Sequence, residues 1–315
     1  MNVDYVFARL AGELVAFEDL CPHGLAPLSG GICTKDTIKC AYHGWEFDSH
    51  GSCVKVPGLG KVSARDKAQL VGVHAIKELF GVIFVAIKPT LTSLLDIPEA
   101  KTNEFLEGSL TPIEIQGSAG LLLGNFLDLV HSPFVHKEDF GDFCDVASPT
   151  LDIRKDIYEF TATYEYYLQN QEDAGVHRGL NPIHQRRKLT YRYSAPFSLL
   201  LEIDHLDDQV RNVIGVFLSP QSRDRVRVLS KFWRNDIKGK RAMNNVMKLE
   251  ESLIRKNLIV QSTLRTLGLS LNPDSQLHAK TDRLTWLLCQ VLTDFLASSA
   301  RIDSENLNYL GTQIP

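Results

Sequence analysis

The chain has 315 residues, of which 44% are hydrophobic and 23% charged, and its formal net charge is -4. These values are ordinary for a soluble globular protein, and the length allows two domains with buried cores. A slightly acidic chain offers no basic surface for nucleic acid or for an anionic membrane. Its apolar runs are too short to span a bilayer. Six cysteines are too few for a disulfide framework, so we expect a reducing, cytoplasmic location.

The first part of the chain is predicted to be a β-domain. Short β-branched and aromatic runs at residues 5–8, 14–17 and 81–85 alternate with turns rich in Gly, Pro and Asp. This spacing is typical of a small antiparallel sandwich or barrel. Residues 91–112 contain Pro, Thr and Glu and are predicted to form a connector. The first domain is therefore placed at residues 1–100.

Residues 101–315 are predicted to form a second domain of the α+β class. An apolar helical stretch at 121–131 comes first, and two amphipathic helices at 242–264 and 281–298 come last. Between them the sequence predicts long strands at 160–167, 189–193, 198–203, 213–218 and 225–233. Strands followed by helices in one block favour an α+β arrangement.

Two short loops near the N-terminus each carry one cysteine and one histidine. Cys21 and His23 form the first pair, and Cys40 and His43 form the second. Zinc is one candidate, but zinc fingers keep their cysteines together and their histidines together, which disfavours it. The pattern suits two irons, one bound by both thiolates and one by both imidazoles, as in a Rieske-type [2Fe–2S] cluster. Trp45 is expected to pack beneath this cluster and shield it from water.

A second group of metal-binding residue types lies early in the second domain. Asp128 and His131 are three residues apart and would share one face of the predicted helix. Pro133 would end that helix and allow His136 to turn back toward His131. Two histidines and a carboxylate, with open positions, form the facial triad of non-haem Fe(II) oxygenases. Taken alone, this segment is also compatible with a helix that carries incidental histidines.

Together the two groups resemble the large (alpha) subunit of a Rieske non-haem iron oxygenase, over residues 3–300. The chain is most similar to the branch of homo-oligomeric aromatic O- and N-demethylases and single-subunit monooxygenases. Residues 124–136 resemble that branch's iron-binding motif, and residues 276–278 and 282–284 resemble its C-terminal helix. The resemblance implies an N-terminal Rieske domain and a helix-grip (START-like) catalytic domain with an apolar pocket over the iron.

The resemblance also implies cofactors and partners. These are one [2Fe–2S] cluster, one mononuclear Fe(II), O₂, a small aromatic or heterocyclic substrate, and a separate NAD(P)H-dependent reductase or ferredoxin. The reaction would be hydroxylation or oxidative demethylation, as in aromatic compound degradation, with mono- and dioxygenation both open. In a homotrimeric ring, Asp128 would link a cluster histidine of one subunit to His131 of the next, and Asn125 would lie close to the iron. The chain itself lacks the Gly-rich fingerprint of a dinucleotide-binding reductase.

The third iron ligand departs from the family pattern. The family supplies an Asp before the phrase that stands here at residues 259–262, and counting back places Lys256 at that position. An ammonium group cannot ligate iron. Glu251 is the preferred substitute because it is anionic and long, with Glu250 and Asn257 as the other candidates. Glu251 as an ordinary solvated helix residue is an equally open interpretation.

The N-terminus and the missing carboxylate leave further interpretations open. Family members usually have several tens of residues before the strand that begins here at Val3, so an N-terminally shortened Rieske domain is expected. Lys256 also allows a different function, an electron-transfer protein with an inactive or iron-free second domain. The basic run at residues 186–188 could help to dock an acidic electron donor.

Overall fold

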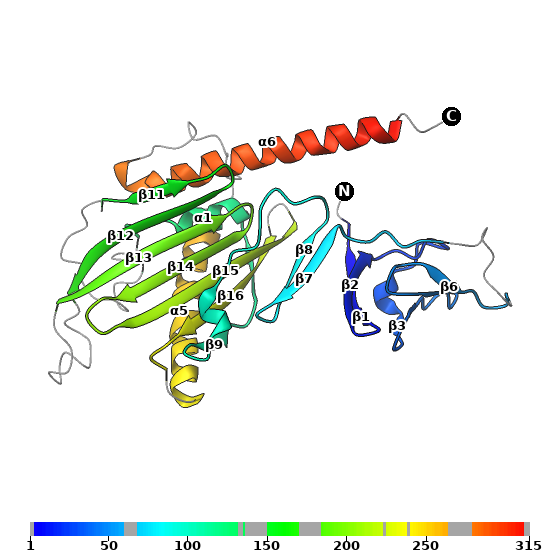
Figure 1. The fold of residues 1–315 in the computed structure, drawn as a ribbon, viewed down its shortest axis with the longest axis horizontal. Coiled ribbons are helices and arrows are strands. Elements are labelled where there is room, and N and C mark those ends of the chain that lie inside the picture. The colour runs from blue at the N-terminus through cyan, green and yellow to red at the C-terminus, as the bar shows by residue number, and fades with distance from the viewer. Residues whose placement is uncertain are drawn as a thin grey trace. The chain divides into compact units, whose positions relative to one another are not determined.

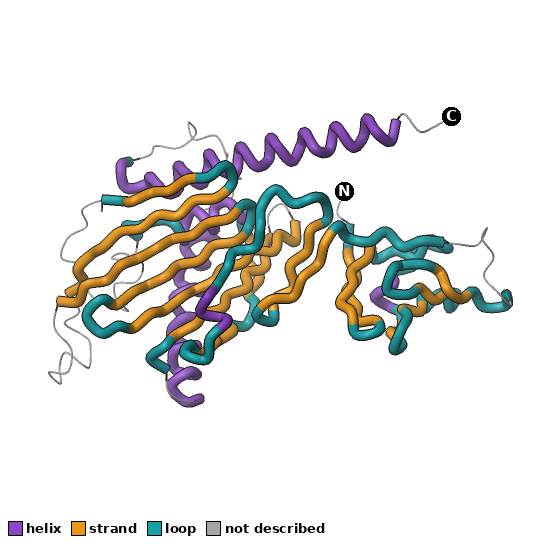
Figure 2. The backbone as a smooth tube through the Cα atoms, viewed as in Figure 1, coloured by secondary structure: helices purple, strands orange, loops and turns teal. Residues whose placement is uncertain are grey.

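The structure is a computed structural model and describes residues 3–59, 68–131, 135, 150–169, 184–222, 225–237, 240–263 and 279–311. Contacts divide the chain into two compact units, Met1–Thr90 and Leu91–Pro315. The first unit contains mostly short strands, whereas the second combines a large sheet with long helices (Figure 2). Residues 91–112, predicted to be a connector, belong to the second unit.

The first unit is an antiparallel β-structure built from hairpins. β1 (Tyr5–Leu10) and β2 (Glu13–Glu18) pair across Ala11 and Gly12, which both have positive φ. Such a two-residue turn matches the right-handed twist of the flanking strands. The other strands are β3 (Ile32–Cys33), β4 (Ile38–Lys39), β5 (Glu46–Phe47), β6 (Cys53–Lys55), β7 (Ala75–Leu79) and β8 (Val82–Ala86). The strands β3 to β6 form one sheet and β7 and β8 form a second hairpin, while the 3₁₀ helix η1 (Leu28–Gly30) precedes β3.

The core of this unit surrounds the two predicted cluster cysteines. Leu28, Ile38 and Phe47 are at most 1% exposed, and Cys21 and Cys40 belong to the same apolar cluster. The loops that carry the cysteines are therefore anchored in the best-packed part of the unit.

The second unit is built on an eight-stranded antiparallel sheet. Its strands follow the order β10-β16-β15-β14-β13-β12-β11, and β9 pairs with another part of β16. They are β9 (Leu106–Ser109), β10 (Ile113–Gln116), β11 (Asp152–Lys155), β12 (Glu159–Gln169), β13 (His184–Ser194), β14 (Ser198–His205), β15 (Val210–Ser222) and β16 (Arg225–Arg234). Each long strand predicted between residues 160 and 233 is present and somewhat longer than predicted.

Helices pack on one face of this sheet. α1 (Ala119–Phe126) contacts α5 (Lys240–Thr263), α6 (Arg283–Gly311) and β15, and α1 and α5 lie behind the sheet in the view of Figure 1. Two 3₁₀ helices, η2 (Pro98–Lys101) and η4 (Lys280–Asp282), flank these elements in the chain. The predicted fold class is confirmed: a β-domain is followed by an α+β domain with a large antiparallel sheet. In the part of the chain that the structure describes, no helix is both long enough and apolar enough to cross a bilayer.

Strand alternation gives this sheet an apolar face toward the helices and a mixed face, on which Leu200 and Val213 are fully buried beside charged side chains. Leu189, Tyr191 and Ile214 face the helices and belong to the main core. The opposite face carries Arg211, which donates to Glu99 (2.8 Å), Glu202 (2.8 Å) and Asp204 (2.9 Å). These bonds fasten η2 to β14 and β15.

Two details of the predicted elements are wrong. α1 ends at Phe126 instead of continuing to residue 131, because the Asp128 N–H donates to the Asn125 carbonyl (3.2 Å) and the Asp128 carboxylate accepts from the Val130 N–H (2.9 Å). Such local side-chain bonds compete with helix continuation. The predicted connector at residues 91–112 contains η2 and β9, and the pairing of β9 with β16 joins segments more than a hundred residues apart in the sequence.

Candidate functional site

The two Cys/His loops of the first unit close in the same way. In each loop the cysteine N–H donates to the carbonyl five residues later, and the N–H four residues later donates back to the cysteine carbonyl. The bonds are Cys21 N to Ala26 O (2.8 Å), Leu25 N to Cys21 O (2.8 Å), Cys40 N to Trp45 O (2.8 Å) and Gly44 N to Cys40 O (3.0 Å). The fourth residue after each cysteine is left-handed, with φ of 56° at Leu25 and 70° at Gly44.

The two cysteines lie together on the buried side of these loops. Each is 2% exposed, and their side chains are within hydrogen-bonding reach of one another. Burial raises the pKa of the Cys21 thiol, while backbone N–H groups of His23 and Gly24 hydrogen-bond its sulfur and oppose the rise. Donors aimed at a sulfur favour the thiolate, which is the form that binds metals.

The two histidines lie together on the exposed side. The ring centroids of His23 and His43 are 4.6 Å apart, and both residues are exposed. Trp45 stacks on His23 with a centroid separation of 4.4 Å and an interplanar angle of 13°, and Tyr42 lies 3.8 Å from the His43 ring. Trp45 therefore packs on a histidine, and its packing beneath a cluster stays a prediction.

The pairing of like ligands matches what a diiron cluster requires. The two loops bring the thiols of Cys21 and Cys40 together, and they bring the imidazoles of His23 and His43 together. A Rieske cluster needs one such pair for each of its irons.

The second candidate centre lies just after α1. His131 Nδ1 is 2.9 Å from the Asp128 backbone carbonyl oxygen and 3.9 Å from its carboxylate Oδ2. A ring nitrogen that donates to a carbonyl leaves the other nitrogen, Nε2, as the one that can bind a metal. The His131 side chain is only 13% exposed, whereas that of Asp128 is 34% exposed. The two residues are thus brought together by a turn and not by the predicted helical face.

The remaining predicted ligands of this centre are only partly described. His136 lies outside the described residues. Glu251 forms an ion pair with Arg255, four residues later on α5, at 2.7 Å. Glu250 is 7% exposed and accepts a hydrogen bond from Asn212, and burial raises its pKa against the effects of Arg234 and Asn212. The Glu251 carboxylate therefore has a partner on its own helix, and its role as an iron ligand stays a prediction.

Three buried side-chain atoms among the described residues have no hydrogen-bond partner: Asn125 Oδ1, Arg187 Nε and Asn212 Oδ1. Leaving a buried polar group unpaired costs about 1–3 kcal/mol. Asn125 lies on α1, and Arg187 and Asn212 occupy the helix-facing phase of β13 and β15. The sequence analysis predicted a role for Asn125 but missed the other two. Both could have been recognised from the sequence as polar residues at strand positions whose alternation places them among the apolar, helix-facing residues.

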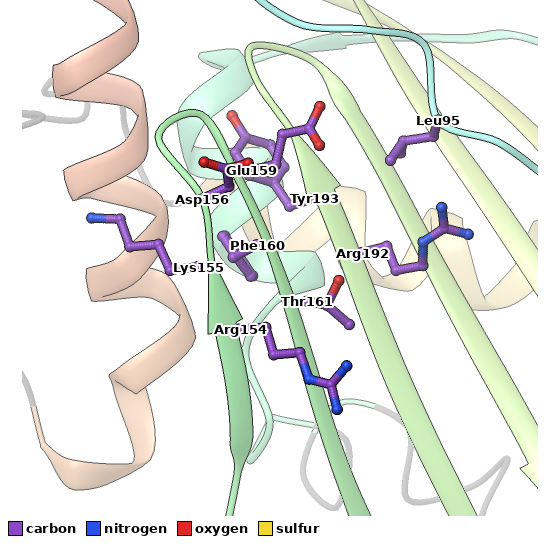
Figure 3. Close-up of a pocket in the computed structure, with 9 residues that line it drawn as sticks. All are labelled: Leu95, Arg154, Lys155, Asp156, Glu159, Phe160, Thr161, Arg192 and Tyr193. Atoms are coloured by element: carbon purple, nitrogen blue, oxygen red, sulfur yellow. The ribbon is translucent and has the colours of Figure 1, made fainter.

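A separate hollow of about 310 Å³ lies where β11 and β12 meet. The described residues that line it include Arg154, Lys155, Asp156, Glu159 and Arg192, so its wall is strongly charged (Figure 3). None of the predicted site residues is among those that line it. Arg192 is already engaged there, since it donates to the Asp96 carbonyl at 2.9 Å and to Glu202 at 3.3 Å.

Comparison with protein families assigns both parts of the chain. Residues 1–70 match the Rieske [2Fe-2S] domain. Residues 115–256 match the vanillate O-demethylase oxygenase C-terminal domain. The first match contains the two Cys/His loops, and the second contains α1, His131 and most of α5.

Curated proteins are similar to parts of this chain. Methylxanthine N1-demethylase NdmA of Pseudomonas putida is 27% identical over 220 residues, which cover 68% of this chain and 59% of NdmA. The chloroplastic protein TIC 55 of Arabidopsis thaliana is 33% identical over 145 residues, which cover 44% of this chain and 27% of TIC 55. The chain thus spans less than two thirds of the length of these relatives.

Solved structures share the fold. Pseudomonas putida CBB5 NdmA with caffeine superposes with a TM-score of 0.77 at 20% identity, over 91% of this chain and 80% of NdmA. Dicamba monooxygenase bound to dicamba gives a TM-score of 0.80 at 16% identity, over 96% of this chain and 92% of the monooxygenase. The chain therefore joins a Rieske [2Fe-2S] domain to an oxygenase C-terminal domain of the vanillate O-demethylase type, and it is homologous to the alpha subunits of Rieske oxygenases.

Proposed function

We propose that this protein is the oxygenase component of a Rieske-type system. It would take electrons from a separate reductase or ferredoxin and use O₂ to hydroxylate or oxidatively demethylate a small aromatic or heterocyclic substrate. When bound, the cluster supplies single electrons and the mononuclear iron activates O₂. The observation that carries this proposal is the presence, in one chain, of paired Cys/His loops and of a His131 ring oriented by the Asp128 carbonyl through its Nδ1.

The residues of the first unit would bind the cluster and determine the side from which electrons leave it. Cys21 and Cys40 would hold the buried iron, and His23 and His43 would hold the exposed one. Because the imidazoles lie at the surface and the thiols in the core, electrons would leave by the histidine side. Trp45 covers one face of His23 and limits water access there.

The residues of the second unit would build the iron site. The Asp128 carbonyl fixes the orientation of His131. His136 and Glu251 are the proposed further ligands, with Glu250 as the alternative. The buried, unpartnered Oδ1 of Asn125 supports a place for this residue beside the metal or its bound water.

We further propose that the protein assembles as a homotrimer and works in the cytoplasm. The Asp128 carboxylate is one-third exposed, so it is accessible to a cluster histidine of a neighbouring subunit. Six cysteines in 315 residues are too few for a disulfide framework, which supports a reducing compartment. Mono- and dioxygenation remain equally compatible with the site.

One observation favours a second candidate function. Lys256 occupies the position where the family has its carboxylate ligand, and Glu251 is paired with Arg255. Without a carboxylate the second unit would bind iron weakly, and the protein would act as an electron carrier only.

Iron and acid-labile sulfide per chain distinguish the two functions. The oxygenase predicts three irons and two sulfides, because one iron is added to the [2Fe–2S] cluster. The His131→Ala variant should then lose one iron and keep both sulfides, whereas the exposed His50→Ala control should lose nothing. Two irons and two sulfides in the unaltered protein, reconstituted with excess Fe(II), would leave only the electron carrier.

A further inference from the structure

A diagonal row of polar side chains, spread over two neighbouring cross-strand positions, crosses one end of the helix-covered face of the sheet. Arg187 on β13 is the register partner of His205 on β14, and Asn212 on β15 is the register partner of Arg234 on β16. Glu250 of α5 reaches this row through its hydrogen bond with Asn212. The strands concerned lie side by side in Figure 1, with α5 behind them.

Part of this row is satisfied within the protein. Arg234 donates to both oxygens of Asp236, at 2.9 and 2.8 Å. The Asn212 amide group donates to Glu250, so its Nδ2 is used. His205 stays neutral, because burial, followed by the charges of Arg187 and Arg234, lowers its pKa to about 4.

Two groups of the row are left over. Arg187 makes one long hydrogen bond, 3.4 Å, to Gln185, and its buried Nε has no partner. Within the described ranges no carboxylate forms an ion pair with it. Asn212 is 4% exposed, and its Oδ1 accepts nothing. A cationic donor and a neutral acceptor thus remain unpaired, two strands and two residues apart, which corresponds to about 12 Å between their Cα positions.

Aromatic side chains connect this row with the His131 segment. Tyr166 is the register partner of Arg187, and Tyr164 stacks on Tyr191 with an interplanar angle of 11°. Tyr191 in turn is close enough to Asp128 for its charge to affect the tyrosine hydroxyl. The helix-covered side therefore runs from polar groups, past tyrosine rings, to the proposed iron site.

We propose that Arg187 and Asn212 bind the polar end of the substrate, and that this substrate is an aromatic or heterocyclic molecule bearing a carboxylate and an N–H or O–H donor. The carboxylate meets the guanidinium of Arg187, and the donor meets Asn212 Oδ1. The inference rests on the proposed function, because the other end of such a molecule would lie toward His131.

The chain offers a matched control for Arg187. Arg186 precedes it on the same strand, so alternation directs it to the opposite face, where it binds Asp207 at 3.2 Å. The same alternation means that the basic run 186–188 does not form a single patch. Arg186→Met and Arg187→Met remove the same charge from the same strand, but only the second removes it from the helix-covered side.

The test measures ligand binding to the metal-loaded, full-length protein by calorimetry, without reductase. The probes are 3-hydroxybenzoate, 3-hydroxybenzamide and benzoate. The unaltered protein should bind 3-hydroxybenzoate about tenfold or more tightly than the neutral amide, as a charge-assisted hydrogen bond predicts. Arg187→Met should abolish this preference, Arg187→Lys should restore part of it, and Arg186→Met should leave it within twofold.

The Asn212 contact is tested by the probes themselves, because Asn212 variants also disturb Glu250. In the unaltered protein 3-hydroxybenzoate should bind several-fold more tightly than benzoate, which lacks the donor. Equal affinity for acid and amide, equal losses in the two Arg variants, or no binding of any probe at millimolar concentration would overturn the inference. Since no turnover is needed, this binding test can succeed or fail independently of the proposed function, which the iron and sulfide content decides.

Discussion

His131 Nδ1 lies 2.9 Å from the backbone carbonyl oxygen of Asp128. The same Asp128 accepts the Val130 N–H on its side-chain Oδ1, at 2.9 Å. The backbone of Asp128 therefore orients the imidazole, and its side chain holds the turn that keeps the backbone in place. One carboxylate oxygen remains for contacts outside this turn.

Substitutions of Asp128 should separate these two roles. Asp128→Asn keeps an acceptor for the Val130 N–H, so we expect unchanged iron content and slower electron delivery to the second centre. Asp128→Ala loses that acceptor, worth about 1 kcal/mol, and should also lower the iron content. Iron per chain and single-turnover electron transfer check both outcomes. Equal iron loss in the two variants would contradict the assigned role of the turn.

Substitutions at the two equivalent left-handed positions, Leu25 and Gly44, should change the stability of the cluster loops in opposite directions. Gly44→Ala places a Cβ 3.1 Å from Pro57 in a left-handed residue, so the variant should lose its visible absorbance at a lower temperature than the unaltered protein. Leu25→Gly removes a left-handed strain of about 1–2 kcal/mol from the matching position and should retain the cluster as well or better. Thermal bleaching followed by absorbance measures both. A Leu25→Gly variant that bleaches as early as Gly44→Ala would show that the two loops are not equivalent.

Acid should destabilise the second unit through His205. Burial lowers the pKa of His205 to about 4, whereas an unfolded histidine titrates near pH 6.5. The unfolded state therefore binds more protons between these values, and stability is lost as the pH falls from about 6.5 toward 4. His205→Asn should lose less stability between pH 7 and pH 5, as measured by urea midpoints. The same pH dependence in both proteins would argue against a neutral, buried His205, and exposed His50→Asn is the control.

Removal of Arg211 should be costly. Its guanidinium pairs with Glu99 and Glu202, which are 7% and 8% exposed, so Arg211→Met leaves the buried Glu99 carboxylate without its cation and leaves Glu202 with Arg192 alone. A loss of about 3 kcal/mol in the free energy of unfolding is expected. Arg186→Met breaks an exposed ion pair with Asp207, so its effect on stability should be much smaller. Losses of similar size in the two variants, measured by urea denaturation, would contradict the assigned role of Arg211.

Much of the first centre could be predicted from the sequence, because a metal cluster constrains residue type and spacing within short loops. The pairing of Cys21 with Cys40 and of His23 with His43 follows directly from such spacing. The long strands were also predictable, because alternation is a local signal. The length of α1 could not be predicted. The helix ends where the Asp128 side chain binds a backbone N–H, and hydrophobic periodicity does not reveal such local hydrogen bonds.

Features that depend on distant segments escaped prediction. β9 is a strand only because β16, far along the chain, pairs with it. Arg187 was treated as one of three adjacent cations, although the strand turns it to the side opposite Arg186. The sequence contained that information, but it required the phase of β13 to be read together with the charge.

The orientation of the cluster loops has a consequence for how the protein meets its electron partners. Cys21 and Cys40 are buried in the core, whereas His23 and His43 face the solvent. The site is therefore accessible for electron transfer only on its histidine side. A donor that approaches from any other direction finds protein in its way. In the proposed function, the incoming reductase and the receiving iron site would therefore use the same imidazole surface, and they would have to take turns.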